Sequence, residues 1–412
     1  MSHHQFVIVG GGTGGITVAA RLLKANSSFD VAIIEPAETH YYQPIWTLVG
    51  AGDSSKEGSA RPMASVIPSK AKWIKDKVTA FDPDNNKVSL EEGGELSYDH
   101  LVVSPGIQVD WDRVEGLAES VGSKNVTSNY SYDTVAYTWE AMKNFKGGVA
   151  VFTQPNTPFK CGGAPQKIMY LADDAWRKSG VRDKTEIIWV LPGESVFGVD
   201  KYRIALEKVV ERKGIKPMFG HHLIAVDADK GEITVENVKT EEQKTIKFDF
   251  IHVTPPMSAP EFCRTSPLAD DEYHPGQCID NAPDARNRLG GWIAVDPKTL
   301  QHTTYKNVWS LGDVANLPTA KTGAGIRKQA PVVVANILSE MAKKELKAKY
   351  NGYASCPLVT GYGKLILAEF DYDGNPNESF PIDQGKERYS MYLMKKHMLP
   401  VMYWQFMLKG RA

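Results

Sequence analysis

The sequence predicts an α/β protein with two Rossmann-like domains and a short C-terminal segment that docks on a membrane. Three observations carry this prediction. The N-terminal stretch FVIVGGGTGGITVAARLL reads as a strand, a glycine-rich turn and a helix. The middle of the chain alternates short apolar strands with helical segments, and residues 389–412 are apolar and basic.

The composition is that of an ordinary globular protein. The chain has 412 residues, of which 42% are hydrophobic and 24% charged, and this length suits two or three domains. Its 48 basic and 49 acidic residues give a net charge of −1, so no nucleic-acid partner is indicated. No apolar run approaches the length of a membrane span, and a strand begins near Phe6, so we expect neither a transmembrane helix nor a targeting peptide.

The first motif is Gly10-x-Gly12-x-x-Gly15, between the first strand and the first helix. Gly10 permits the tight turn, Gly12 lets a pyrophosphate approach the backbone, and Gly15 lets helix and strand pack closely. The second strand, VAIIEP, ends in Glu35, whose carboxylate can accept both ribose hydroxyls of an adenosine. The register of strand, helix and acid predicts a dinucleotide site.

Two later segments indicate FAD as that dinucleotide. Residues 77–106 read as a β-meander that returns to a buried strand and ends in Ser-Pro-Gly at Gly106. KNVWSLGDVANLP reads as a short strand followed by Gly312 and Asp313. Together with the first glycines, these segments resemble flavoproteins of the two-dinucleotide-binding-domain class, which are related to glutathione reductase. In that class the aspartate that matches Asp313 hydrogen-bonds the ribityl chain of FAD; the alternative for Asp313 is a helix N-cap.

Residues 128–256 match the second nucleotide domain of that class, but they lack the glycine loop that NAD requires. The candidate turns, TQPNTPFKCGG and LPGESVFGV, do not have the G-x-G-x-x-G spacing. We predict a discontinuous FAD-binding domain at 1–115 and 280–340, a second Rossmann-like domain at 116–279, and a C-terminal redox-cysteine and membrane-docking region at 341–412.

Four segments in order resemble the sulfide:quinone oxidoreductases, membrane-surface flavoproteins that oxidise hydrogen sulfide. They are HYYQPIWTLVGAG, NTPFKCGGAPQKIMYL, HVTPPM and ASCPLVTGYGKLILAEFDY. The resemblance covers nearly the whole chain and is strongest for the branch that includes the mitochondrial enzyme of animals. It implies that Cys161 lies beside the flavin, that Cys356 is its redox partner although 195 residues away, and that Pro44 packs near the flavin.

The resemblance also implies the reaction and its partners. Hydrosulfide would attack the oxidised cysteine pair, leaving a persulfide on Cys356 and a thiolate on Cys161. Two electrons would pass through FAD to ubiquinone or another membrane quinone. A small acceptor (glutathione, sulfite, cyanide or sulfide) would remove the sulfur.

We expect a peripheral protein of the bacterial cytoplasmic membrane or the mitochondrial inner membrane, and a homo-oligomer is compatible with the sequence. Two alternatives stay open. One is a type II NADH:quinone dehydrogenase, and the other is a flavin-bearing interaction protein of the apoptosis-inducing-factor kind.

Local sequence predicts how charge is stabilised at this site. Cys161 precedes a helix with Pro165 in its first turn, and the helix dipole and Lys160 would favour a negative sulfur. The helix after Asp313 should face the pyrimidine ring of the flavin, where Lys321 would stabilise negative charge. The alternative for Lys321 is an ordinary surface lysine.

The C-terminal segment predicts helices that lie in the membrane interface. Three methionines have helical spacing before Pro400, which should break the helix, and the apolar run VMYWQFML follows. Lysines and an arginine flank these pieces: Lys395, Lys396, Lys409 and Arg411. The alternative is a dimer interface or an interdomain core.

The remaining cysteines, Cys263 and Cys278, lie in a polar loop. We interpret both as structural, with a local disulfide between them left open. No cysteine or histidine spacing indicates a metal site.

Overall fold

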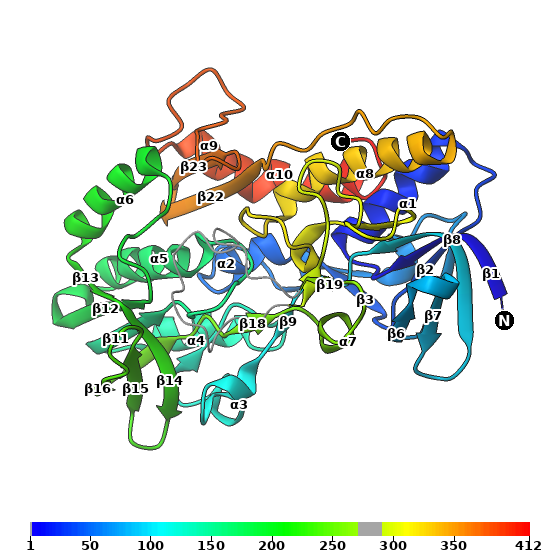
Figure 1. Ribbon diagram of the computed structural model, residues 1–412. Coiled ribbons are helices and arrows are strands. Elements are labelled where there is room, and N and C mark those ends of the chain that lie inside the picture. The colour runs from blue at the N-terminus through cyan, green and yellow to red at the C-terminus, as the bar shows by residue number, and fades with distance from the viewer. Residues whose placement is uncertain (1, 271–290) are drawn as a thin grey trace.

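The computed structural model describes residues 2–270 and 291–412 and contains a mixed sheet and a parallel sheet at opposite ends of the molecule (Figure 1). The first sheet has the strand order β5-β2-β1-β8-β7-β6, and β21 pairs with β8. Its strands are β1 (Ser2–Val9), β2 (Val31–Ile34), β5 (Lys72–Ile74), β6 (Val78–Asp82), β7 (Lys87–Leu90), β8 (Glu95–Val103) and β21 (Val308–Ser310). The β-meander predicted for residues 77–106 is confirmed by the antiparallel strands β6, β7 and β8.

Strand β1 lies between β2 and β8 and runs parallel to both. Its residues from Val7 to Val9 are buried, as parallel strands with both faces covered require. The chain turns at the predicted glycines into α1 (Thr13–Ala25), which packs beside α8 (Gly323–Met341) (Figure 1). This order of strand, turn and helix builds the first nucleotide-binding unit.

The second sheet is entirely parallel, with the order β10-β17-β11-β12-β13. Its strands are β10 (Val126–Thr127), β11 (Gly148–Thr153), β12 (Thr185–Leu191), β13 (Ile215–Phe219) and β17 (Phe250–His252). The connecting helices are α4 (Val135–Asn144), α5 (Ala164–Lys178) and α6 (Asp200–Lys213). The predicted alternation is confirmed, and the structure adds an antiparallel sheet of β14 (His221–Asp227), β15 (Glu232–Asn237) and β16 (Gln243–Lys247).

Short elements connect these units. They are the pair β3 (Thr39–Tyr41) and β4 (Ala60–Pro62), the pair β9 (Gln108–Val109) and β18 (Met257–Ser258), the pair β19 (Ala269–Asp270) and β20 (Trp292–Ile293), and the helices α2 (Trp46–Val49), α3 (Leu117–Ser120) and α7 (Glu261–Arg264). Cys263 lies in α7 and is fully buried, so the expectation of a polar loop is wrong for this residue. Its burial raises the pKa of the thiol. Cys278 lies outside the described residues.

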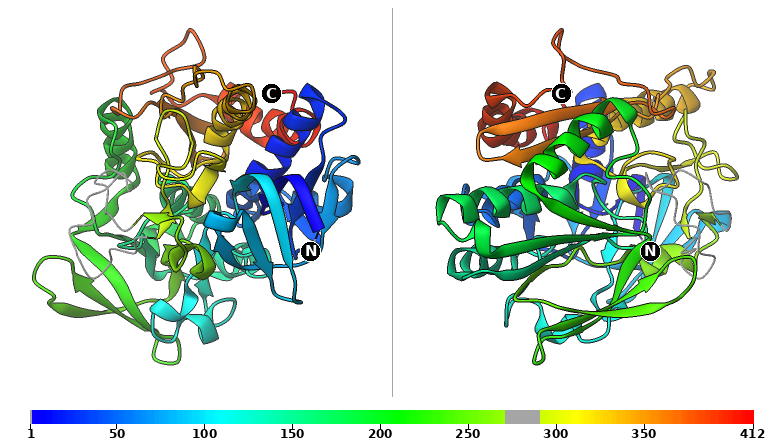
Figure 2. Two further views of the ribbon diagram at one scale, coloured as in Figure 1. Left: turned by 45° about the vertical axis from the view of Figure 1, so that its right-hand side comes forward. Right: turned by 90° about the vertical axis from the view of Figure 1, so that its left-hand side faces the viewer.

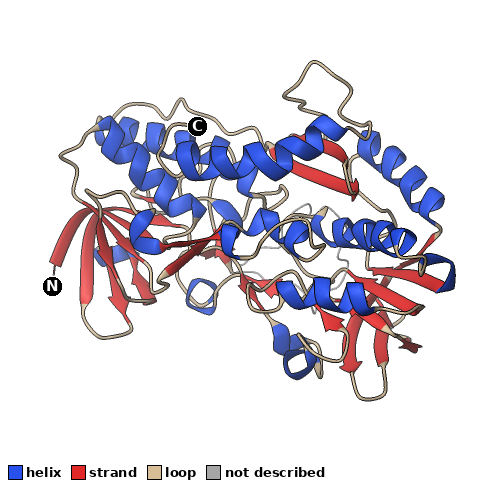
Figure 3. Ribbon diagram, turned by 180° about the vertical axis from the view of Figure 1, so that it is seen from behind, coloured by secondary structure: helices blue, strands red, loops and turns tan. Residues whose placement is uncertain are grey.

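The C-terminal region consists of a hairpin and a nearly continuous helical segment (Figure 3). The hairpin strands are β22 (Ala354–Gly361) and β23 (Lys364–Phe370), and β22 packs against α5. Helices α9 (Tyr389–Leu393) and α10 (Leu399–Val401) alternate with π-helical turns at Met394–Met398 and Met402–Met407. The predicted break at Pro400 is wrong: the widened turns let the helical path continue past a residue that has no N–H to donate.

The fold brings three chain regions to one place. One large buried cluster extends from the first sheet through α5 to the β22–β23 hairpin, and a smaller cluster lies between the second sheet and β14–β16. Figure 2 shows the C-terminal helices beside α1 and α8, on the same side of the molecule as the hairpin. The predicted domain boundary near residue 280 falls outside the described residues, so these bounds stay a prediction.

Candidate active site

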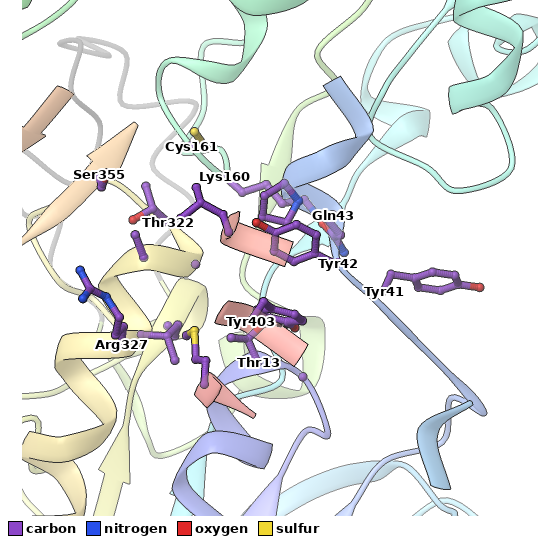
Figure 4. Close-up of a pocket in the computed structure, with 18 of the residues that line it drawn as sticks. Thr13, Tyr41, Tyr42, Gln43, Lys160, Cys161, Thr322, Arg327, Ser355 and Tyr403 are labelled. Carbon is purple, nitrogen blue, oxygen red and sulfur yellow. Dashed lines mark hydrogen bonds between the residues drawn. The ribbon is translucent and has the colours of Figure 1, made fainter. Parts of the chain in front are cut away.

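A cavity of about 900 Å³ runs from the glycine turn of the first sheet to the C-terminal segment. Figure 4 shows side chains from all three regions around it, with Thr13 and Tyr403 on one side and Cys161 on another. Among the predicted site residues, those that line the cavity are Gly12, Glu35, Pro44, Gly106, Cys161, Gly312, Asp313 and Lys321. Gly10 and Gly15 stand behind this wall and shape it.

The three glycines of the turn have three different geometries. Gly10 has φ of +99°, and a Cβ there would lie 2.5 Å from the carbonyl oxygen of Ser104. Gly12 has nothing within 4 Å of an added Cβ, so its backbone is open to the cavity. A Cβ on Gly15 would lie 1.9 Å from the Gly10 oxygen and 3.0 Å from Cγ2 of Ile8. Glycine is therefore needed at Gly10 for the tight turn, at Gly12 for a close approach of the pyrophosphate to the backbone, and at Gly15 for the packing of helix against strand.

Glu35 stands at the end of β2 beside this turn. Its Oε2 accepts the Gly11 N–H at 2.8 Å, and its Oε1 accepts the Ala37 N–H at 2.8 Å. These bonds fix the carboxylate at the cavity wall, where a ribose would meet it.

Asp313 and Lys321 follow β21, which ends at the same carboxyl edge of the first sheet as the glycine turn. Burial raises the pKa of the Asp313 carboxyl, and the Lys321 and Lys160 ammonium groups oppose that shift. Lys321 is buried, and its Nζ donates to the carbonyl oxygens of Asp313 at 2.6 Å and Ala315 at 3.2 Å. It also lies 3.8 Å from the centre of the Trp292 ring. Lys321 is therefore a buried cation at the cavity wall, and the surface alternative is wrong.

The cavity fits a flavin dinucleotide. Gly12, Gly106 and Gly323 line it, and each has open space where a side chain would project. The length of the cavity joins the Glu35 carboxylate at one end to Asp313 and Cys161 at the other. The residues that would hold FAD are the glycine turn and Glu35 at the adenosine half, and Asp313, Lys321 and the α8 N-terminus at the flavin half.

The two cysteines that the resemblance pairs are in contact. Their Sγ atoms lie 3.8 Å apart, although 195 residues separate them in sequence. Cys161 is in the turn between β11 and α5 and has φ of +61°, a left-handed conformation that costs energy for a side chain with a Cβ. Its N–H donates to the Lys321 oxygen at 2.8 Å, which holds the turn in place. Cys356 is in β22 and is fully buried.

The two thiols have opposite acidities. The hydrogen bond between the sulfurs, and then the Lys167 ammonium, hold the pKa of Cys161 well below its ordinary value. The same hydrogen bond and burial hold the pKa of Cys356 well above its ordinary value. The single proton of the pair therefore stays on Cys356, and Cys161 is the thiolate.

The cation beside Cys161 is Lys167, which lies in the first turns of α5 and has its Nζ 3.3 Å from the Cys161 Sγ. The expectation that Lys160 has this role is wrong, because its Nζ donates instead to Oε1 of Gln43 at 2.8 Å. Lys167 could not be identified from the sequence alone. Its side chain lies on a helix that begins at Ala164, and whether it reaches Cys161 depends on the geometry of the turn before that helix.

The α5 N-terminus points toward the second sulfur. The Gly163 N–H hydrogen-bonds to Cys356 and lowers its pKa in part. A Cβ on Gly163 would lie 2.3 Å from Cδ2 of Leu358 and 3.5 Å from Cβ of Cys356. This glycine therefore lets β22 approach the turn closely enough for the sulfurs to meet.

The C-terminal segment closes the cavity with polar groups as well as apolar ones. Lys395 is buried, donates from Nζ to the Pro44 oxygen at 2.9 Å, and has its pKa lowered to about 7 by burial and by Lys167. The hydroxyl of Tyr403 contacts Nε2 of His40 at 2.5 Å and Oγ1 of Thr13 at 2.8 Å. The sequence analysis placed Lys395 among the flanking charges and did not single out Tyr403.

Comparisons with known proteins identify the family. Residues 4–254 match the family model described as pyridine nucleotide-disulphide oxidoreductase. The mitochondrial sulfide:quinone oxidoreductase of Mus musculus is 45% identical over 99% of this chain and 87% of its own length. The mitochondrial sulfide:quinone oxidoreductase of Dictyostelium discoideum is 46% identical over 99% of this chain and 86% of its own length.

A solved structure shares the fold. It is the sulfide:quinone oxidoreductase from the bacterium Aquifex aeolicus, with a TM-score of 0.76, 19% identity, and coverage of 100% of this chain and 92% of that chain. FAD-dependent oxidoreductase chemistry follows from the family match and the relatives. The chain belongs to the pyridine nucleotide-disulphide oxidoreductases and, within them, to the sulfide:quinone oxidoreductase family.

Proposed function

We propose that this protein oxidises hydrogen sulfide through the Cys161–Cys356 pair and delivers two electrons to a membrane quinone. The observation that carries the proposal is the 3.8 Å contact between the two sulfurs, of which Cys161 lines the cavity and Cys356 lies buried directly behind it. This contact places a thiolate and a partner thiol at the end of the cavity where the flavin would bind. The second sheet of the protein has no glycine loop of the kind that binds NAD.

The sulfur step uses the oxidised pair. Hydrosulfide attacks Cys356 Sγ, the Cys161–Cys356 bond breaks, and the products are a Cys356 persulfide and a Cys161 thiolate. The two sulfurs lie 3.8 Å apart and are not bonded in the structure, so only a small approach separates them from the about 2.05 Å of a disulfide. A small nucleophile then takes the outer sulfur; we propose glutathione, sulfite, cyanide or a second sulfide.

Lys167 and Lys395 stabilise the negative charge that this step leaves on Cys161. Lys167 stabilises the leaving Cys161 thiolate directly. Lys395 also lowers the pKa of Cys161, and its own pKa of about 7 lets it gain or lose a proton near neutral pH. FAD supplies the two-electron chemistry that links sulfide oxidation to quinone reduction.

The apolar end of the cavity suits a quinone. Apolar side chains of the hairpin, the loop after it and the C-terminal helical segment line this end: Leu367, Phe380, Met394, Met398, Val401, Met402 and Phe406. Several of them are also exposed at the surface, so a quinone can enter from an adjoining lipid phase.

We propose peripheral attachment to a mitochondrial inner membrane or a bacterial cytoplasmic membrane. Within the described residues, no helix is both long and apolar enough to span a bilayer. The exposed apolar side chains of the C-terminal segment support attachment through this segment. We also propose three domains: an FAD-binding domain at residues 1–115 and 280–340, a second Rossmann-like domain at 116–279, and a C-terminal region at 341–412. The alternative role of the C-terminal segment is self-association of the protein.

Anaerobic flavin bleaching tests the function. The purified protein, loaded with FAD, is mixed with sulfide or with NADH, and loss of the visible flavin absorbance is followed in a stopped-flow instrument. We expect rapid bleaching by sulfide, and reoxidation when a water-soluble ubiquinone analogue is added. Rapid bleaching by NADH would instead support a type II NADH dehydrogenase, and bleaching by neither would support an interaction protein.

A further inference from the structure

The C-terminal segment exposes an unusual concentration of apolar side chains. Seven of the nine large hydrophobic residues that are exposed in the described part of the chain lie between residues 380 and 406. This set, the C-terminal patch, is Phe380, Ile382, Tyr389, Leu393, Met398, Val401 and Phe406. It comes from the loop after β23 and from the turns of α9 and α10, which lie on the same side of the molecule in Figures 1 and 3.

The helical part of this patch carries charge of one sign. Residues 388–412 contain lysines and arginines and no aspartate or glutamate. Two of the lysines are used inside the protein, because Lys395 binds the Pro44 oxygen and Lys396 binds Oδ1 of Asp53 at 2.8 Å. Lys409 and Arg411 remain exposed at the surface, and their backbone N–H groups donate to the backbone oxygen of Phe406 in the patch. The Lys409 ammonium donates to the neutral Oε1 of Gln405 at 2.8 Å.

A third cation joins them from the first domain. The guanidinium of Arg61 lies 5.1 Å from the centre of the Trp404 ring. One of its nitrogens, Nη1, donates to the Ala60 oxygen at 2.9 Å. Stacking on the indole holds the charge beside the C-terminal segment, and the rest of the guanidinium fork can bind an anion. Indole rings with one polar edge favour the headgroup depth of a bilayer.

Carboxylates near the patch do not neutralise these three cations. Glu378 pairs with Lys201 at 2.7 Å, and Glu387 pairs with Arg212 at 2.7 Å. In the part of the chain that the structure describes, no carboxylate lies within ion-pair distance of Arg61, Lys409 or Arg411. The face is therefore apolar in its centre and positive at its rim.

We propose that this face docks on a bilayer containing anionic phospholipids, with Arg61, Lys409 and Arg411 binding their phosphate groups. This inference rests on the membrane attachment proposed above and adds the lipid class. Each cation near an anionic surface strengthens binding about fivefold, so the three together contribute about a hundredfold. The apolar patch adds attraction that does not depend on lipid charge.

The experiment measures binding of the FAD-loaded protein to two vesicle types. One is phosphatidylcholine alone, and the other contains added phosphatidylglycerol. The test variant carries Arg61→Gln, Lys409→Gln and Arg411→Gln. The matched control carries Lys146→Gln, Lys208→Gln and Lys244→Gln, three exposed cations outside the C-terminal segment.

We expect the parent protein and the control to bind the anionic vesicles about a hundredfold more tightly than the neutral ones, and added salt to remove most of that difference. The test variant should bind both vesicle types weakly and about equally. Val401→Ser with Phe406→Ser should weaken binding to both types, which reports on the patch itself.

Two outcomes would overturn the inference separately from the attachment. Equal binding of the parent to both vesicles would keep the attachment and exclude anionic selectivity. Equal losses in the test and control variants would show that overall charge, and not this rim, is responsible. If the parent protein binds neither vesicle type, the proposed membrane attachment itself is wrong.

Discussion

Cys161 and Cys356 share one proton, and their surroundings decide which sulfur keeps it. The Lys167 ammonium is in contact with Cys161, whereas Cys356 is enclosed by β22 and α5. The hydrogen bond between the sulfurs lowers the pKa of Cys161 and raises that of Cys356, and the Lys167 ammonium lowers the pKa of Cys161 further. At the scale of the residue, the pair is therefore asymmetric before sulfide arrives.

Single cysteine variants should show this asymmetry in the visible spectrum. In Cys356→Ser the Cys161 thiolate should remain beside FAD and give a long-wavelength absorbance that fades on acidification, as the thiolate is protonated. In Cys161→Ser the band should be absent while FAD stays bound, and both variants should lose rapid bleaching by sulfide. The band appearing in Cys161→Ser and not in Cys356→Ser would mean that the two roles are reversed.

Replacing Lys167 should raise the pKa of the Cys161 thiol, because the cation in contact with the thiolate is lost. In a Cys356→Ser background, Lys167→Met should slow alkylation of Cys161 by iodoacetamide at neutral pH by about tenfold. The rate should recover at higher pH, which separates a shifted pKa from a blocked site. Lys178→Met, further along the same helix and over the Tyr362 ring, is the control and should leave the rate unchanged.

Elements near the glycine turn could be predicted because their signals are local. Strand β1, the turn and α1 follow one another in sequence, and Gly15 is required by Gly10 and Ile8, a few residues away. The C-terminal segment could not be predicted in the same way. Pro400 indicates a break by its own chemistry, and only packing against α1 and the cavity shows why the helical path continues.

Tyr403 connects this segment to the dinucleotide turn, so its hydroxyl should affect FAD retention. Tyr403→Phe leaves the buried Nε2 of His40 and the hydroxyl of Thr13 without that partner. We expect a loss of about 1–3 kcal/mol in the free energy of unfolding, and earlier release of fluorescent flavin on heating. Tyr389→Phe, in the same segment but exposed, should change neither measurement. Equal flavin release from the two variants would exclude the connection.

At the scale of the whole molecule, the site depends on contacts that no stretch of sequence contains. The family resemblance implies that Cys161 and Cys356 meet, but their cation, Lys167, needs the pitch of α5, and Lys395 needs the C-terminal segment to fold back over Pro44. The same folding buries ionisable groups that the sequence analysis left in ordinary roles. His40 and His252 are two of them, and they make the stability of the whole protein depend on pH.

Acid should destabilise the protein before its carboxylates are protonated. Burial lowers the pKa of His40 to about 4 and that of His252 to about 3, whereas an unfolded histidine titrates near 6.5. Below about pH 6.5 the unfolded chain therefore binds protons that the folded protein does not, so stability falls as the pH falls. Each histidine should cost about 2 kcal/mol on going from pH 7 to about pH 5.

The free energy of urea unfolding, measured with excess FAD at several pH values, checks this. His40→Gln should reduce the acid-dependent loss by about 2 kcal/mol, because the glutamine amide does not titrate. His221→Gln, a histidine that is not buried, is the control and should keep the full loss. The His252 ring accepts the Asn129 N–H at Nε2, a bond that protonation would break, so this residue should contribute a loss of its own. A loss of the same size in His40→Gln as in the parent would mean that His40 becomes charged in the folded protein as readily as in the unfolded chain, which contradicts its burial between the dinucleotide turn and Tyr403.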